Sequence, residues 1–119
     1  MFARSTAVLI LCLGAAACGS SSTSPSSNPN FPNQVTIPSN ASTLSTTAYS
    51  PNPITVGAGG TVTWVNNDNT THTATATDNS WNSGNIAPGG NFSRTFPTAG
   101  TFQYNCTIHP NMVGTVTVQ

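Results

Sequence analysis

The sequence has very few charged residues. Only 3% of its positions are Asp, Glu, Lys or Arg, and the formal net charge is zero. The charged side chains are Arg4, Asp68, Asp78 and Arg94. A nucleic-acid-binding protein needs a basic patch, and these residues cannot form one. A weak electrostatic field also steers partners poorly, so we expect any docking to depend on apolar contact and shape.

Strong helix formers are scarce beyond the first residues of the chain. Thr, Val, Asn and Gly dominate instead, in short runs that are separated by turn residues. This texture favours strands over helices. With 119 residues the chain is long enough for one domain. We therefore expect a single all-β domain.

Cysteine is also too rare for a disulfide framework. The chain has three cysteines, Cys12, Cys18 and Cys106. Cys12 falls in a predicted signal peptide and Cys18 at its end, so Cys106 is the one thiol left for the folded domain. A single cysteine in a secreted chain calls for an explanation, and a metal is one.

The N-terminus predicts export. Arg4 precedes an apolar run over Ala7–Ala17 that is shorter than the roughly 20 residues needed to cross a bilayer. Small residues before Cys18 resemble the bacterial lipoprotein signal, which implies a lipid on Cys18, although Ala15 stands where Leu is usual. Ordinary cleavage after Ala17 is the alternative. Residues 1–17 are thus predicted to be a signal peptide.

A tether and a domain are predicted to follow. Residues 18–32 are rich in Ser, Pro and Asn and have almost nothing to bury, which is typical of a disordered linker. Residues 33–119 form the predicted domain. We expect it in the bacterial periplasm or at the cell surface, held to a membrane only by the lipid anchor, and monomeric.

Short β-prone runs predict the strands of this domain, and the spacing of turn signals between them is typical of a sandwich. The expected strands are 34–37, 46–49, 54–56, 61–65, 71–77, 91–96, 101–106 and 115–118. The expected core is Val35, Ile37, Ile54, Val56, Val62, Trp64, Phe92, Phe96, Phe102, Val116 and Val118. We also expect Asp68, Asp78 and Arg94 to be solvated.

The most informative stretch is Tyr104–Met112, which contains the pattern C-x-x-H-x-x-M between two β-prone runs. A loop there could aim Cys106, His109 and Met112 at one point. Two His, one Cys and a weak axial Met are the ligands of a blue-copper electron-transfer site. The second imidazole must come from His72, the one other histidine in the chain. The sequence thus predicts one copper ion held by these four residues.

The same segment resembles the cupredoxins, and the plastocyanin/amicyanin branch in particular. Similar motifs are Val62–Trp64 ahead of the first His, Ala87–Gly90 before Phe92, and Ala99–Phe102 before Tyr104. The resemblance implies a Greek-key β-sandwich of eight strands or slightly fewer, with copper at one end.

One residue departs from the family's pattern. Many relatives have Asn after the first His, where its amide braces the Cys loop, and this chain has Thr73. A hydroxyl group cannot replace an amide fully. We therefore expect the loop to be braced more weakly, or to be braced from Asn66 or Asn67.

We expect a type 1 copper protein that carries single electrons between redox proteins outside the cytoplasm, with partners docking near His109. Storage or delivery of copper would use the same ligands and is the alternative. Zinc also binds Cys and His, but Met is a poor zinc ligand. An enzyme is disfavoured, because the sequence offers no further His cluster, paired acids or nucleophile triad.

Overall fold

We describe residues 31–119 from a computed structural model of the chain. The predicted signal peptide, Cys18 and nearly all of the predicted tether lie outside the described residues. No helix among those residues is long and apolar enough to cross a membrane.

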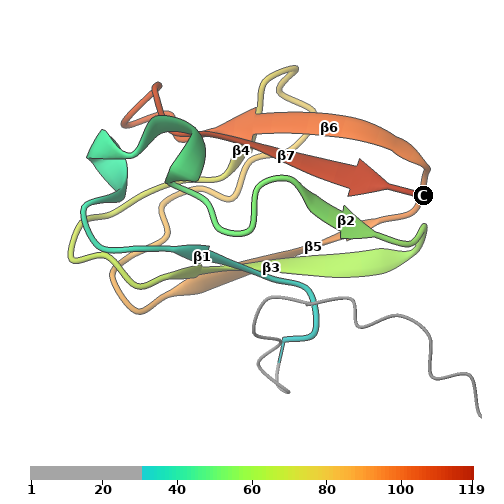
Figure 1. Ribbon diagram of the computed structural model, residues 1–119, viewed down its shortest axis with the longest axis horizontal. Helices are drawn as coiled ribbons and strands as arrows, with labels where there is room; N and C mark the ends of the chain where they lie inside the picture. The colour runs from blue at the N-terminus through green and yellow to red at the C-terminus, as the bar shows by residue number, and fades with distance from the viewer. Residues whose placement is uncertain (1–30) are drawn as a thin grey trace, which may run out of the picture.

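The described chain is an all-β sandwich, as predicted, with two short 3₁₀ helices near its start. Figure 1 shows two layers of strands facing each other. The elements in chain order are β1 (Gln34–Ile37), η1 (Ala41–Thr43), η2 (Ser45–Thr47), β2 (Ile54–Val56), β3 (Gly60–Asn66), β4 (Thr75–Ala76), β5 (Asn91–Phe96), β6 (Gly100–Asn105) and β7 (Val113–Val118).

One sheet has the strand order β1-β3-β5 and the other has the order β2-β7-β6-β4. In the first sheet β1 runs parallel to β3, and β3 runs antiparallel to β5. In the second, β2 runs parallel to β7, while β6 is antiparallel to both β7 and β4. The chain therefore crosses repeatedly between the layers, which places residues distant in sequence at the same end of the sandwich.

The core lies between the two layers because alternate residues of each strand point inward. All of the predicted core residues are buried except Phe92 and Phe102, which are partly buried and pack against the core. Trp64 is at its centre, with the rings of Trp81 and Tyr104 each 5.3 Å away between centroids. The core is thus largely aromatic.

One predicted strand is wrong, and another is much shorter than predicted. Residues 46–49 were expected to be extended, but Ser45–Thr47 forms η2, in which Thr47 N–H donates to Leu44 O. Ser45, which precedes the predicted strand, has φ 51°, a left-handed conformation typical of a turn. Of residues 71–77, only Thr75–Ala76 forms a strand, and His72 makes a single bridge to Ile86.

The loops that matter for function gather at one end. In Figure 1 the arrow of β6 points toward the same end as η1 and η2, while the C-terminus lies at the opposite end. Cys106 directly follows β6, and His72 follows the loop after β3. The fold therefore brings the predicted ligands to a common end of the sandwich.

Candidate metal centre

Three of the four predicted ligands converge. The donor atoms of His72, Cys106 and His109 all lie within 4.8 Å of one another. Cys106 Sγ is 3.9 Å from His72 Nδ1 and 3.8 Å from His109 Nδ1. Metal–nitrogen and metal–sulfur bonds are about 2.0–2.3 Å long, so separations near 4 Å suit donors around one ion. The residues therefore fit a single metal.

The loop between β6 and β7 is closed by its own backbone. Cys106 N–H donates to Met112 O at 3.0 Å, and Met112 N–H donates to His109 O at 2.9 Å. Just before and after the loop, Asn105 pairs with Val113 across β6 and β7. These contacts hold Cys106 and His109 on one short turn, while the Met112 side chain is completely buried.

His72 lies in the loop between β3 and β4, and its backbone is held by two hydrogen bonds with Ile86. Its N–H donates to Ile86 O, and Ile86 N–H donates to His72 O at 2.7 Å. The Asn66 amide lies between these segments and donates to the carbonyls of Thr70 and Ile86. The His72 side chain is fully buried as a result.

Thr73 joins the two loops. Its backbone N–H donates to Cys106 Sγ at 3.3 Å, and its hydroxyl oxygen accepts from Thr107 N–H at 2.9 Å. The same hydroxyl lies 3.1 Å from that of Thr75. The sequence suggested Asn66 or Asn67 as a substitute brace. The Asn66 side chain bonds on the His72 side of the centre, and Asn67 N–H donates to Ile37 O. The contact with the Cys loop therefore comes from Thr73 itself.

Tyr49 stabilises the contact between these two loops. Its hydroxyl donates to Thr73 O, and its ring packs edge-on against Tyr104 at 4.7 Å between centroids. Burial, and then the neighbouring Cys106, raises the pKa of the Tyr49 hydroxyl above its ordinary value. The hydroxyl therefore stays protonated and remains a donor. This contact was not predicted, because residues 46–49 were expected to form a strand.

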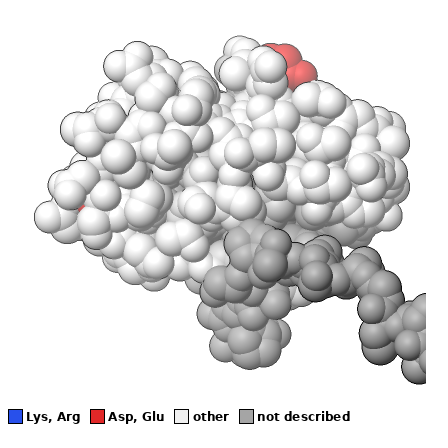
Figure 2. Space-filling view, viewed as in Figure 1, with Lys and Arg blue, Asp and Glu red and all other residues white. Residues whose placement is uncertain are grey.

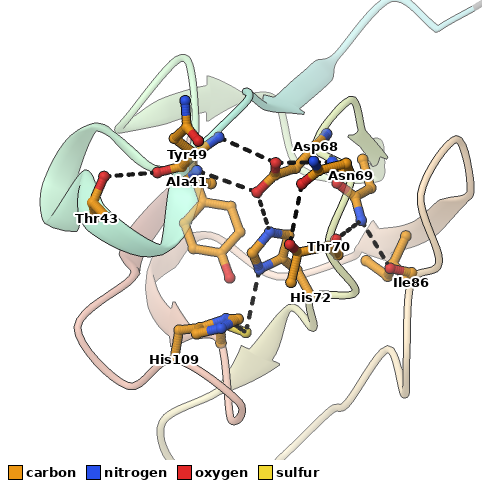
Figure 3. A network of polar contacts seen from close by, with 12 residues as sticks. Ala41, Thr43, Tyr49, Asp68, Asn69, Thr70, His72, Ile86 and His109 are labelled. Atoms are coloured by element: carbon orange, nitrogen blue, oxygen red, sulfur yellow. Dashed lines mark hydrogen bonds and ion pairs between the residues drawn. The ribbon is translucent and has the colours of Figure 1, made fainter.

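The position of Asp68 differs from the prediction. It was predicted to be a solvated charge, but it is only 6% exposed. Its Oδ2 lies 2.8 Å from His72 Nε2, on the opposite side of the ring from Cys106, as the close view in Figure 3 shows for Asp68 and His72. Hydrogen bonds, first from His72 and then from backbone N–H groups, hold the pKa of this carboxyl below its usual range. Only the spacing of Asp68 and His72 could have pointed to the contact.

The two imidazoles differ in exposure. His72 is fully buried, whereas His109 is partly exposed beside Ile108. Ile108 is 47% exposed and is the one large hydrophobic residue exposed among residues 31–119. The surface drawn in Figure 2 is almost free of charged side chains. The centre thus reaches solvent on the His109 side, through a neutral surface.

Comparisons with known proteins agree with this geometry. Residues 36–119 match the family described as copper binding proteins of the plastocyanin/azurin family. A plastocyanin from Scenedesmus fuscus is 38% identical over 84 residues, which cover 60% of this chain and 86% of the plastocyanin.

Solved structures show the same likeness. A purple cupredoxin from Nitrosopumilus maritimus superposes with a TM-score of 0.69 at 32% identity, covering 73% of this chain and 99% of that one. The reduced Cu(I) form of an amicyanin variant gives a TM-score of 0.60 at 29% identity, covering 73% and 81%.

Proposed function

Since the chain belongs to the plastocyanin/azurin family of copper-binding proteins, we propose that His72, Cys106, His109 and Met112 hold its single copper ion. The protein is a cupredoxin that carries single electrons. The observation that supports this ligand set most strongly is the convergence of two imidazole nitrogens and one sulfur within 4.8 Å. Met112 is completely buried in the same loop, and its thioether would supply the fourth, weaker donor.

When bound, copper supplies a one-electron couple between Cu(I) and Cu(II). The protein's contribution is to hold the ligands so that they move little when the electron arrives or leaves. His72 is fixed by two backbone bonds to Ile86, and Cys106 by Met112 O and Thr73 N–H. Rigid support of this kind keeps the donor positions similar in the two oxidation states.

The same side chains would serve copper storage or delivery. Within residues 31–119, the cluster of His72, Cys106 and His109 is the one group of such side chains placed to hold an ion. The donor set is the same for a carrier of electrons and a carrier of copper. Rigid bracing on both sides of Cys106 favours the electron carrier, because a delivery protein must release its ion readily.

We further propose that redox partners dock over His109. The partly exposed His109 and the exposed Ile108 form the neutral route from the centre to solvent. Family members are typically extracytoplasmic, and we propose that Cys18 carries a lipid anchor, with 18–32 as the tether. The intact mass of the mature protein tests the anchor, since a mass without acyl chains at Cys18 would exclude it.

The test of function is to add Cu(II) to the purified mature protein and to record visible and electron spin resonance spectra. We expect an intense thiolate-to-copper absorption, one copper per chain and reversible one-electron voltammetry. Cys106→Ser is the control and should lose the absorption. A weakly coloured protein that surrenders Cu(I) readily to an acceptor would instead indicate storage or delivery.

A further inference from the structure

Asp68 is a buried acid in a chain with almost no charge. Its carboxylate collects four hydrogen bonds from separate parts of the fold. Oδ1 accepts from Asn40 N–H at 3.1 Å and Asn69 N–H at 2.8 Å, and Oδ2 accepts from Ala41 N–H at 3.3 Å. The fourth partner is His72 Nε2, 2.8 Å from Oδ2. Burying a charge is costly unless it is well partnered, so this arrangement calls for a role.

We infer that Asp68 is a positioning residue, which fixes the tautomer of His72 and thereby sets the balance between the two copper oxidation states. The inference rests on the proposed function, because it takes His72 as a copper ligand. An ionised carboxylate can only accept hydrogen bonds, so Nε2 of His72 must carry the hydrogen. A neutral imidazole has only one such hydrogen. Nδ1 is then left with a free lone pair, and it is Nδ1 that faces Cys106 Sγ at 3.9 Å.

The direction of the redox effect follows from charge. A carboxylate bonded to the far nitrogen makes the imidazole a stronger electron donor, and it adds negative charge near the metal in a low-dielectric surrounding. Both effects favour Cu(II) over Cu(I). Asp68 should therefore hold the reduction potential below the value that the four ligands alone would give.

A purely structural role is the competing explanation. Asp68 also ties η1 to the loop after β3 through Asn40 and Ala41, and its loss would loosen that connection whether or not His72 is a ligand. Measurements of stability cannot separate the two roles. The tautomer of His72 and the reduction potential can, because the η1 connection alone changes neither.

Asp68→Asn is the sharpest variant because it keeps the shape of the side chain. If the amide oxygen remains with the N–H groups of Asn40 and Asn69, the amide NH₂ faces His72. His72 must then accept at Nε2 and carry its hydrogen on Nδ1, the atom needed by the metal. Loss of such an outer partner typically weakens metal binding about 10- to 100-fold.

Asp78→Asn is the matched control. Asp78 is exposed, and its removal takes the same unit of charge from the protein surface. We expect Asp68→Asn to weaken Cu(II) more than Cu(I) and to raise the potential by about 59 mV for each tenfold difference between the two losses. Asp78→Asn should leave both affinities and the potential unchanged.

The experiment begins with the wild-type mature protein after removal of metal by a chelator. Long-range ¹H–¹⁵N NMR should show His72 with its hydrogen on Nε2, and voltammetry of the copper-loaded variants should then give the shift above. A His72 hydrogen on Nδ1 in the wild type, or equal potentials for Asp68→Asn and Asp78→Asn, would overturn the inference. If Asp68→Asn does not fold, the wild-type tautomer still decides.

Failure of the proposed function would look different. If the copper-treated wild-type protein shows no thiolate-to-copper absorption, the proposed set of copper ligands is wrong. If the wild-type protein shows this absorption but Asp68→Asn has the same reduction potential as the wild type, the proposed function stands and only the role of Asp68 is excluded.

Discussion

The two histidines of the centre are held in opposite ways. His72 is fully buried, bonded to Ile86 through its backbone and to Asp68 through its ring. His109 sits on a short loop in which its neighbours Ile108 and Pro110 are exposed and His109 itself is partly exposed. Their ring centroids are nevertheless only 5.0 Å apart.

This difference separates two requirements of an electron carrier. The buried side supplies a fixed geometry, because several elements would have to move together to displace His72. The exposed side supplies access, because an electron must enter or leave through atoms that a partner can approach. We expect substitutions on the His72 side to change copper binding and the stability of the fold. Substitutions on the His109 side should change how solvent molecules and redox partners reach the centre.

The largest effect is expected from replacing His72 with glycine, and the same substitution at His109 should have a much smaller one. His72→Gly empties a buried space and leaves Asp68 without its ring partner, so the free energy of unfolding of the copper-free protein should fall by about 3 kcal/mol. His109→Gly removes a partly exposed ring and should cost about 1 kcal/mol or less. Urea unfolding of both copper-free variants measures this contrast.

Added imidazole then distinguishes the two sites. The gap in His109→Gly opens to solvent, so millimolar imidazole with Cu(II) should restore thiolate-to-copper absorption. The gap in His72→Gly is enclosed, and the same addition should not. Rescue of His72→Gly, or equal loss of stability in both variants, would contradict the division into a buried and an exposed side.

The ligand loop between β6 and β7 was the easier part of the centre to predict from sequence. Cys106, His109 and Met112 are close neighbours in the chain, so their spacing alone indicated a common loop, and His72 followed as the one remaining histidine. Several strands of the sandwich alternate clearly, and 34–37, 54–56 and 91–96 were predicted with the bounds that the structure has.

The buried side depends on contacts that leave little trace in the sequence. Asp68 stands in a polar run that is typical of a solvated turn, and only the tertiary approach of η1 encloses it. Residues 71–77 alternate like a strand, but they pair in pieces with residues of the 82–86 segment and with β6. Residues 72–76 are all buried, so the alternation of Thr and Ala in the sequence does not show which segment each of them pairs with.

Thr73 offers a smaller test, because it connects the two sides. Thr73→Val keeps the backbone N–H that bonds Cys106 Sγ but removes the hydroxyl acceptor of Thr107 N–H. The unfolding free energy of the copper-free protein should fall by about 1 kcal/mol, while the potential stays close to that of the wild type. Thr73→Ser retains the hydroxyl, so its free energy of unfolding should fall less than that of Thr73→Val. A large shift in potential for Thr73→Val would mean that the hydroxyl, and not the backbone N–H, controls the sulfur.

The smallest change in stability is expected from Ile108→Ser. This substitution is also the most specific test of the exposed side. Ile108 is 47% exposed, so its removal should alter stability by no more than about 0.5 kcal/mol. When two copies meet through their His109 faces, however, each would bury this side chain. Losing that apolar contact should slow electron self-exchange roughly five- to tenfold.

Line broadening in NMR spectra of mixed oxidised and reduced protein measures the self-exchange rate. Ala99→Ser is the control, since Ala99 is exposed just before β6, at the end of that strand away from Cys106. It should leave the rate unchanged, because no partner needs that end to reach the centre. If Ile108→Ser exchanged electrons as fast as the wild type, access would have to run through another surface, and the contrast between the two histidines would describe packing alone.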